Sequence, residues 1–143
     1  MLAILVKEHK SILEVASRIG TMLTAATQPD HYPLGATRWE FVRMLMQHLT
    51  FKDACVYRVL LKKEPVQARN SINHLLEECR ALYAAYRRHT VQWDPDALAR
   101  EWPRYKMETL ILISRLNRLV ADERRLLYPL ASHWTLSGKP VAA

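Results

Sequence analysis

The segment "LVKEHKSILEVASRIGTML", from Leu5 to Leu23, decides the fold class. Inward-facing positions recur in it at alternating spacings of three and four residues, the pattern of one face of an amphipathic bundle helix. These positions begin at Leu2, just before the quoted segment, and are Leu2, Leu5, His9, Ile12, Ala16, Ile19 and Leu23. The pattern predicts a helix from about Leu2 to Ala26, with the imidazole of His9 in the middle of its apolar stripe.

The same periodicity predicts three more long helices. The second covers about Arg38 to Lys63, and the third covers about Val66 to His89. The fourth is in phase from Tyr105 and reaches about Tyr128, where Pro129 is expected to end it. Four amphipathic helices predict an all-α chain that folds as an up-down-up-down four-helix bundle.

Local signals mark the ends of these helices. Thr37, followed three residues later by Glu40, predicts a capping box for the second helix. Asp94 before Pro95 is typical of an N-cap and N1 pair, so a helical turn is expected to start there. Pro103 is expected to kink that turn or restart a helix.

The size and composition of the chain fit one domain. The sequence has 143 residues, 50% of them hydrophobic, and only three glycines. We expect one bundle over residues 1–132 and a C-terminal tail over residues 133–143, whose stretch "SGKPVAA" (137–143) is expected to be loose. No apolar run approaches the roughly 20 residues of a membrane span, and no signal peptide is recognisable, so a cytoplasmic protein with no membrane partner is expected.

The net charge of +7 bears on the choice of partner. The basic residues are scattered and lack interleaved aromatic platforms or a recognition helix, which does not favour nucleic-acid binding. The arginine-rich outer faces of the third and fourth helices are instead candidate contacts for an acidic protein partner or a second copy of the chain. The two cysteines, Cys55 and Cys79, form no disulfide framework, and burial as small hydrophobes is favoured over a ligand or redox role.

Ionisable residues on the inner stripes carry the functional signal. His9, His48, Lys52 and Glu123 fall centrally on their stripes, and each costs several kcal/mol if it is buried without a partner. The second stripe is expected to continue through Cys55 and Val59. The remaining histidines fall off the stripes, in connectors or at helix ends, and are expected at the surface; they are His31, His74, His89 and His133.

Four stretches together resemble the hemerythrin-like (HHE-type) domain family. "LVKEHKSIL" (5–13) resembles the first-helix motif, and "HLTFKDACVYRVL" (48–60) resembles the second-helix motif His-x-x-x-Glu. "LLEECRALYAAY" (75–86) and "LVADERRLLYP" (119–129) resemble the third- and fourth-helix motifs. They occur in the order of the family, and the resemblance extends from Leu5 to Leu130.

The resemblance implies a non-haem di-iron centre for dioxygen binding or for iron, oxygen or redox sensing. Carried over residue by residue, it keeps His9, His48 and Glu123 as metal ligands. Lys52 stands where a carboxylate is expected, while Cys79 and Leu119 stand at imidazole positions. An ammonium has no lone pair to donate to a metal. The simplest arrangement therefore has Lys52 paired with Glu123, as a built-in cation in place of a metal.

The alternatives are different classes of protein. The favoured one is a non-enzymatic bundle with a degenerate di-iron site and no cofactor, acting as a regulatory or interaction module. The other is a metal-binding sensor or carrier, in which His9, His48 and Glu123 hold one Fe or Zn, or a complete di-iron pair forms. Cys79 as a fourth ligand favours zinc. An enzyme is not expected, because no phosphate loop or nucleophile motif is present.

Overall fold

The computed structural model describes residues 1–25 and 31–142, with the backbone alone described for residues 31 and 32. The helices are α1 (Leu2–Leu23), α2 (His31–Phe51), the π-helix η1 (Lys52–Tyr57), α3 (Arg58–Lys63), α4 (Val66–Gln92), α5 (Pro95–Arg100) and α6 (Trp102–Ala131). The described residues contain no strand, only an isolated antiparallel bridge between Trp134 and Pro140. The expectation of an all-α chain is therefore confirmed.

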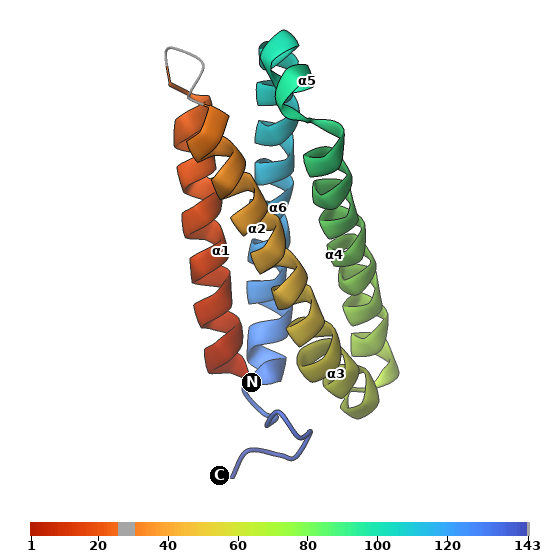
Figure 1. Ribbon diagram of the computed structural model, residues 1–143. Helices are drawn as coiled ribbons and strands as arrows, with labels where there is room; N and C mark the ends of the chain where they lie inside the picture. The colour runs from red at the N-terminus through yellow and green to blue at the C-terminus, as the bar shows by residue number, and fades with distance from the viewer. Residues whose placement is uncertain (26–30, 143) are drawn as a thin grey trace.

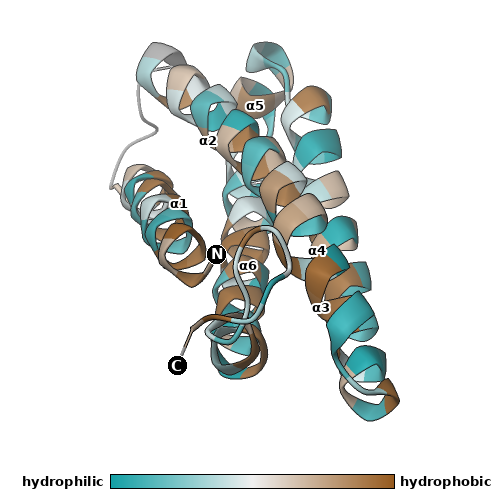
Figure 2. Cartoon of the chain, turned by 90° about the horizontal axis from the view of Figure 1, so that it is seen from below, coloured by the Kyte–Doolittle hydropathy of each residue, from teal (hydrophilic) through white to brown (hydrophobic). Residues whose placement is uncertain are grey.

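The long helices lie side by side (Figure 1), and their buried side chains form one core. α1 packs against α2 and α6, and α4 packs against the same two helices, so each of the four has two helical neighbours. α2, η1 and α3 follow one another without a break from His31 to Lys63. Figure 2 shows hydrophobic and hydrophilic residues on different sides of the same helices, as amphipathic sequences require.

The core is made of side chains from every long helix. Three tyrosines, Tyr57, Tyr83 and Tyr105, are among its largest fully buried members. A buried tyrosine hydroxyl usually finds a hydrogen-bond partner, and those of Tyr57 and Tyr83 do, whereas that of Tyr105 has none among the described residues. This composition leaves room for the ionisable residues that the sequence places on the inner stripes.

Several helix ends differ from the expectation. α1 ends at Leu23, and the expected end at Ala26 lies outside the described residues. α2 begins at His31 rather than Arg38, because Pro33 lies in its first turn, where proline is tolerated. Thr37 is therefore inside the helix, where its hydroxyl donates to the Pro33 carbonyl at 2.8 Å, and the predicted capping box is wrong.

Asp94 and two prolines lie at the ends of α5 and α6. Asp94 caps α5 by accepting a hydrogen bond from the Ala97 amide at 2.8 Å, as predicted. Pro103 lies in the first turn of α6, so it restarts a helix. Pro129, however, does not end α6, which continues to Ala131. A proline in the last turn of a helix removes only one backbone hydrogen bond, which the helix tolerates.

The tail after α6 is folded rather than loose in the described residues. The amide of Thr135 donates to the Lys139 carbonyl at 2.8 Å, and the amide of Val141 donates to the His133 carbonyl at 2.9 Å. Gly138 allows this turn because its φ is 76°, a conformation that other residues rarely adopt. The Trp134 indole donates to Glu64 at 3.1 Å and so ties the tail to the end of α3.

Candidate functional site

Four ionisable side chains meet in the interior of the helices. His9 comes from α1, His48 from α2, Lys52 from the start of η1 and Glu123 from α6. Lys52 and Glu123 are 0% exposed, and the two histidines are 1% exposed. The prediction that these four residues face inward is therefore confirmed.

Lys52 and Glu123 form a completely buried ion pair. The Lys52 Nζ atom donates to both carboxylate oxygens of Glu123, at 2.8 and 2.9 Å. Burial alone would lower the pKa of Lys52, but the Glu123 carboxylate together with Tyr83 and Cys79 outweighs burial and raises it. Burial alone would raise the pKa of Glu123, but Lys52 and His9 together outweigh burial and lower it. Both groups are therefore charged at neutral pH.

Tyr57 completes the hydrogen bonding of the carboxylate. Its hydroxyl donates to Glu123 Oε2 at 2.7 Å. In an α-helix, residues five apart such as Lys52 and Tyr57 point about 140° apart, so both could not face one carboxylate. Here they are the first and last residues of a π-helical turn, whose i→i+5 pattern brings such residues into line. The wider turn therefore gives Glu123 two donors from one segment.

The π-helical turn also shifts the phase of the buried stripe by one residue. The expectation that the stripe continues through Cys55 and Val59 is wrong, because both are only half-buried. Val56 and Leu60 are fully buried instead. One extra residue in the turn accounts for the displacement, since every later side chain is rotated by one position relative to an unbroken α-helix.

Cys79 and Tyr83, both on α4, surround the ammonium from the other side. Lys52 Nζ lies 3.1 Å from Cys79 Sγ and 3.3 Å from the Tyr83 hydroxyl. Burial raises the pKa of the Cys79 thiol to about 11, so the sulfur is protonated at neutral pH. Cys79 is buried as expected and acts as a weak acceptor for the lysine.

His9 is held between a tyrosine and the carboxylate. Its Nδ1 atom lies 2.6 Å from the Tyr128 hydroxyl, and the two rings are stacked. Its Nε2 atom lies 3.2 Å from Glu123 Oε1 but lacks the alignment of a hydrogen bond. Tyr128 therefore fixes the ring, while Nε2 faces the centre of the site.

Glu8 fixes the second imidazole. Glu8 Oε2 lies 2.5 Å from His48 Nδ1, which places the ring N–H on Nδ1 and leaves Nε2 as the bare nitrogen. Burial and the Lys52 ammonium lower the pKa of His48 to about 2, so the ring is neutral at neutral pH. Sequence reasoning did not single out Glu8, although it is next to His9 in the chain.

A pocket of about 310 Å³ between α1 and α2 reaches this histidine. Glu8 and His48 line the pocket, together with side chains such as Ile4 and Met44. The Glu8 side chain is 34% exposed, whereas that of His48 is 2% exposed. Solvent therefore reaches the carboxylate of the pair and stops at the imidazole.

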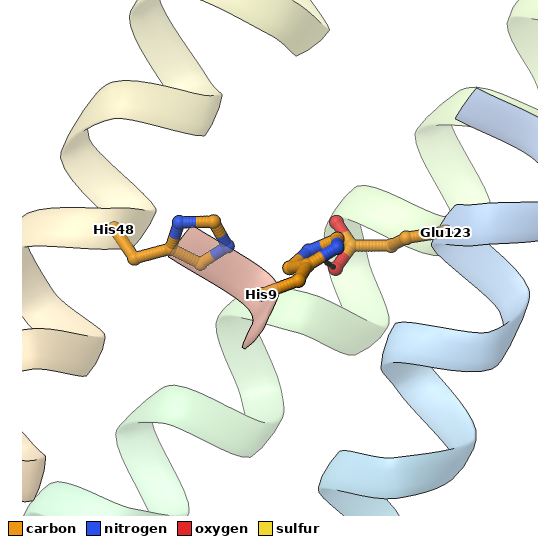
Figure 3. Close-up of side chains that lie close together, drawn as sticks. All are labelled: His9, His48 and Glu123. Carbon is orange, nitrogen blue, oxygen red and sulfur yellow. Dashed lines mark ion pairs between the residues drawn. The ribbon is translucent and has the colours of Figure 1, made fainter. Parts of the chain in front are cut away.

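Three possible metal donors converge in the site. One ligand atom each from His9, His48 and Glu123 lies within 4.8 Å of the other two, and Figure 3 shows His9 between its two neighbours. The Nε2 atoms of both histidines are buried without a hydrogen-bond partner. Cys79 is not part of this group of three, and Leu119 is buried in the core of α6.

A second polar cluster lies around His89, for which the sequence predicts a surface position. His89 is 9% exposed, its Nε2 atom lies 3.2 Å from the Thr109 hydroxyl, and its ring stacks on Tyr105. The expectation of a surface residue is wrong because α4 continues to Gln92. The guanidinium of Arg38 donates to carbonyls at this end of α4, so this region is a polar part of the core.

Comparison with known protein families, with curated proteins and with solved structures finds no match to this chain. The geometry of the site is therefore the basis for a functional proposal. Among the described residues, no helix has the length and apolar character needed to cross a membrane.

Proposed function

We propose that the chain is a hemerythrin-like, up-down-up-down four-helix bundle whose metal centre has been replaced by an internal ion pair, and that it acts as a non-enzymatic regulatory or interaction module. Four long helical stretches around one core support this architecture: α1, α2 through α3, α4 and α6. α5 is a short addition in the connection between α4 and α6. The four sequence motifs that resemble the family fall one on each stretch.

The observation that carries the proposal is the contact of Lys52 with both oxygens of Glu123, at 2.8 and 2.9 Å. Glu123 is the carboxylate that the family resemblance assigns to the metal. A metal ion would bind through the lone pairs of the Glu123 carboxylate. These lone pairs already accept hydrogen bonds from the Lys52 ammonium and from the Tyr57 hydroxyl. A cation built into the chain thus balances the charge of the carboxylate.

The donor set also disfavours a di-iron centre. Of the six positions that the resemblance assigns to ligands, Lys52, Cys79 and Leu119 carry no imidazole or carboxylate. Two iron ions held close together need several anionic or imidazole ligands to offset their charge, and an ammonium among them is repelled. The residues present therefore do not fit a pair of iron ions.

The same network supports the proposed non-enzymatic role. Lys52 and Glu123 are both fully buried, and their opposite charges are paired with each other. A catalytic group must come within hydrogen-bonding reach of the reacting atom, and no substrate reaches a side chain that is 0% exposed. The helix surfaces, rather than the interior, are then the parts that meet other molecules.

A second candidate function, a single-metal sensor or carrier, is favoured by the two unpartnered imidazole nitrogens. His9, His48 and Glu123 would hold one Fe or Zn ion, with Tyr128 and Glu8 orienting the imidazoles from their far sides. Such an ion would supply reversible ligand binding, and redox sensing would require iron because zinc has no redox chemistry. Lys52 opposes it, because its ammonium contacts one of the three ligands.

The metal content of the purified protein separates the two functions. The full chain is purified from iron-supplemented medium and from zinc-supplemented medium, then analysed for metal and by visible spectroscopy. We expect colourless protein with far less than one metal ion per chain and with a stability that a chelator does not change. One tightly held ion per chain, lost to a chelator together with stability, would replace the proposal by the second candidate.

A further inference from the structure

The outer face of α4 and α6 carries a shallow groove with opposite charges at its two ends. Its apolar lining residues are the buried Leu82 and Leu119 and the exposed Ala81. Its charged residues are Arg115 and Arg118, which are positive, and Glu78 and Asp122, which are negative. Arg115 and Asp122 lie on the same side of α6, about 10 Å apart along its axis. The groove thus has a positive end and a negative end.

The charges of the groove are available to a partner. Within the described part of the chain, neither Arg115 nor Arg118 has a carboxylate oxygen within 4.0 Å. The acidic residues contact only exposed neighbours: Asp122 pairs with Arg125, whose side chain is 80% exposed, and Glu78 pairs with His74 at 3.3 Å. Exposed pairs of this kind contribute little and exchange readily for better ones.

The face around the groove is large enough for a stable interface. α4 has 27 residues and α6 has 30, so both are about 40 Å long. Two helices of this length, about 10 Å apart, present roughly 800 Å², the area that one partner contributes to a standard protein interface. Met107 and Ile111 lie on the same side of α6 as the arginines and are 58% and 54% exposed, which adds apolar surface.

We infer that a second copy of this chain docks on the α4–α6 groove in a two-fold symmetric homodimer. In such an interface the same patch meets itself in opposite orientation. The arginines of one copy then face Glu78 and Asp122 of the other. A uniformly acidic partner would satisfy the arginines but would place like charges against the acidic end. The inference rests on the interaction role proposed above and not on the metal content.

A charge-swap experiment tests the two-fold arrangement on the full chain. One variant carries Arg115→Glu and Arg118→Glu, which makes the groove acidic throughout, and the other carries Glu78→Lys and Asp122→Lys, which makes it basic throughout. Sedimentation equilibrium of each variant alone is expected to show a dimer dissociation constant raised by more than about tenfold, because like charges now face each other. An equimolar mixture of the two is expected to dimerise again, because opposite charges meet at both ends.

A control variant makes the same charge change outside the groove. Arg58 and Lys62 on α3 are exposed and do not line the groove, so Arg58→Glu with Lys62→Glu should leave the dissociation constant within about twofold of the original. A chain that stays monomeric at hundreds of micromolar would overturn the inference, as would a dimer that both groove variants preserve. Failure of the mixture to dimerise, with circular dichroism showing both variants folded, would also overturn it. Metal analysis of the same samples tests the proposed function separately.

Discussion

Lys52 and Tyr57 lie five positions apart in the chain, yet their side chains end on the same buried carboxylate. The ammonium contacts both oxygens of Glu123, and the tyrosine hydroxyl contacts one of them at 2.7 Å. The π-helical turn between the two residues makes this possible. π-helical turns of this kind are frequent at functional sites, and this one coincides with the residue that we propose stands in for a metal.

Removing the tyrosine hydroxyl tests the second donor of the carboxylate. Tyr57→Phe leaves Glu123 with one hydrogen bond fewer in a site without solvent, so the free energy of unfolding should fall by about 1.5–3 kcal/mol. Tyr83→Phe is the matched control, because its hydroxyl contacts Lys52 at the longer distance of 3.3 Å. Urea denaturation should show the smaller loss for Tyr83→Phe. Equal losses of unfolding free energy in the two variants would contradict a stronger contribution from the Tyr57 hydroxyl.

A double-mutant cycle measures the buried ion pair itself. Lys52→Met removes the cation and leaves the Glu123 carboxylate buried without a countercharge, which should cost about 3–5 kcal/mol of unfolding free energy. Adding Glu123→Gln removes the charge and keeps an acceptor for Tyr57, so the double variant should regain most of that loss. Arg80→Met breaks an exposed ion pair with Asp53 and should cost no more than about 1 kcal/mol. Additive losses in the cycle would contradict a coupled pair.

The contact between Glu8 and His48 predicts one tautomer. Nitrogen NMR of the folded chain should show the His48 proton on Nδ1 and a bare Nε2, because Glu8 accepts the Nδ1–H at 2.5 Å. Glu8→Ala removes the acceptor, so a mixture of tautomers and a loss of about 1–3 kcal/mol of unfolding free energy are expected. Glu14→Ala, on the exposed side of the same helix, should change neither quantity. A tautomer that is unaffected by Glu8→Ala would show that another contact orients the ring.

Acid should destabilise the fold through His89. Burial and the nearby Arg38 lower its pKa to about 4 in the folded chain, against 6.5 for an ordinary histidine, although Glu108 acts in the opposite direction. Between pH 6.5 and pH 4, His89 is therefore protonated in the unfolded chain but not in the folded chain. Stability is lost as the pH falls through this range. The loss at this site has a slope of at most about 1.4 kcal/mol per pH unit.

Urea denaturation from pH 8 to pH 4 measures this effect. His89→Gln should flatten the dependence below pH 6.5 relative to the original chain, while the exposed His74→Gln should leave it unchanged. The lowered pKa of His48 acts in the same direction in all three proteins, so the difference between them isolates His89. Identical pH dependence in the original chain and His89→Gln would contradict the burial of this ring.

Periodicity alone was enough to predict the helical class and the inward orientation of four ionisable residues. Spacing records which face of a helix is buried, and His9, His48, Lys52 and Glu123 fit their stripes. It could not reveal the π-helical turn after Phe51, because one additional residue in a turn leaves no local mark in the sequence. After this turn the buried residues are therefore Val56 and Leu60, rather than the predicted Cys55 and Val59.

Contacts between distant segments explain the remaining differences. His89 is in phase with the α4 stripe, three residues after Tyr86, but the sequence predicts a helix end there, whereas α4 continues to Gln92. Its burial depends on packing against Tyr105, a residue of α6. Glu8 could not be predicted because it lies beside the stripe of α1. Its contact with His48 depends on how α2 packs against α1.

Iron binding by a reverted chain tests the central claim, that Lys52 occupies the place of a metal. Anaerobic Fe²⁺ titration is compared between the original chain and a variant with Lys52→Glu and Leu119→His, which supplies two of the donors that the family resemblance assigns. Lys52→Met alone is the control that removes the cation without adding donors. The account predicts no stoichiometric binding by the original chain and an affinity at least about tenfold higher in the reverted variant than in the control. Tight stoichiometric iron binding by the original chain, or no gain in the reverted variant when it is folded, would contradict it.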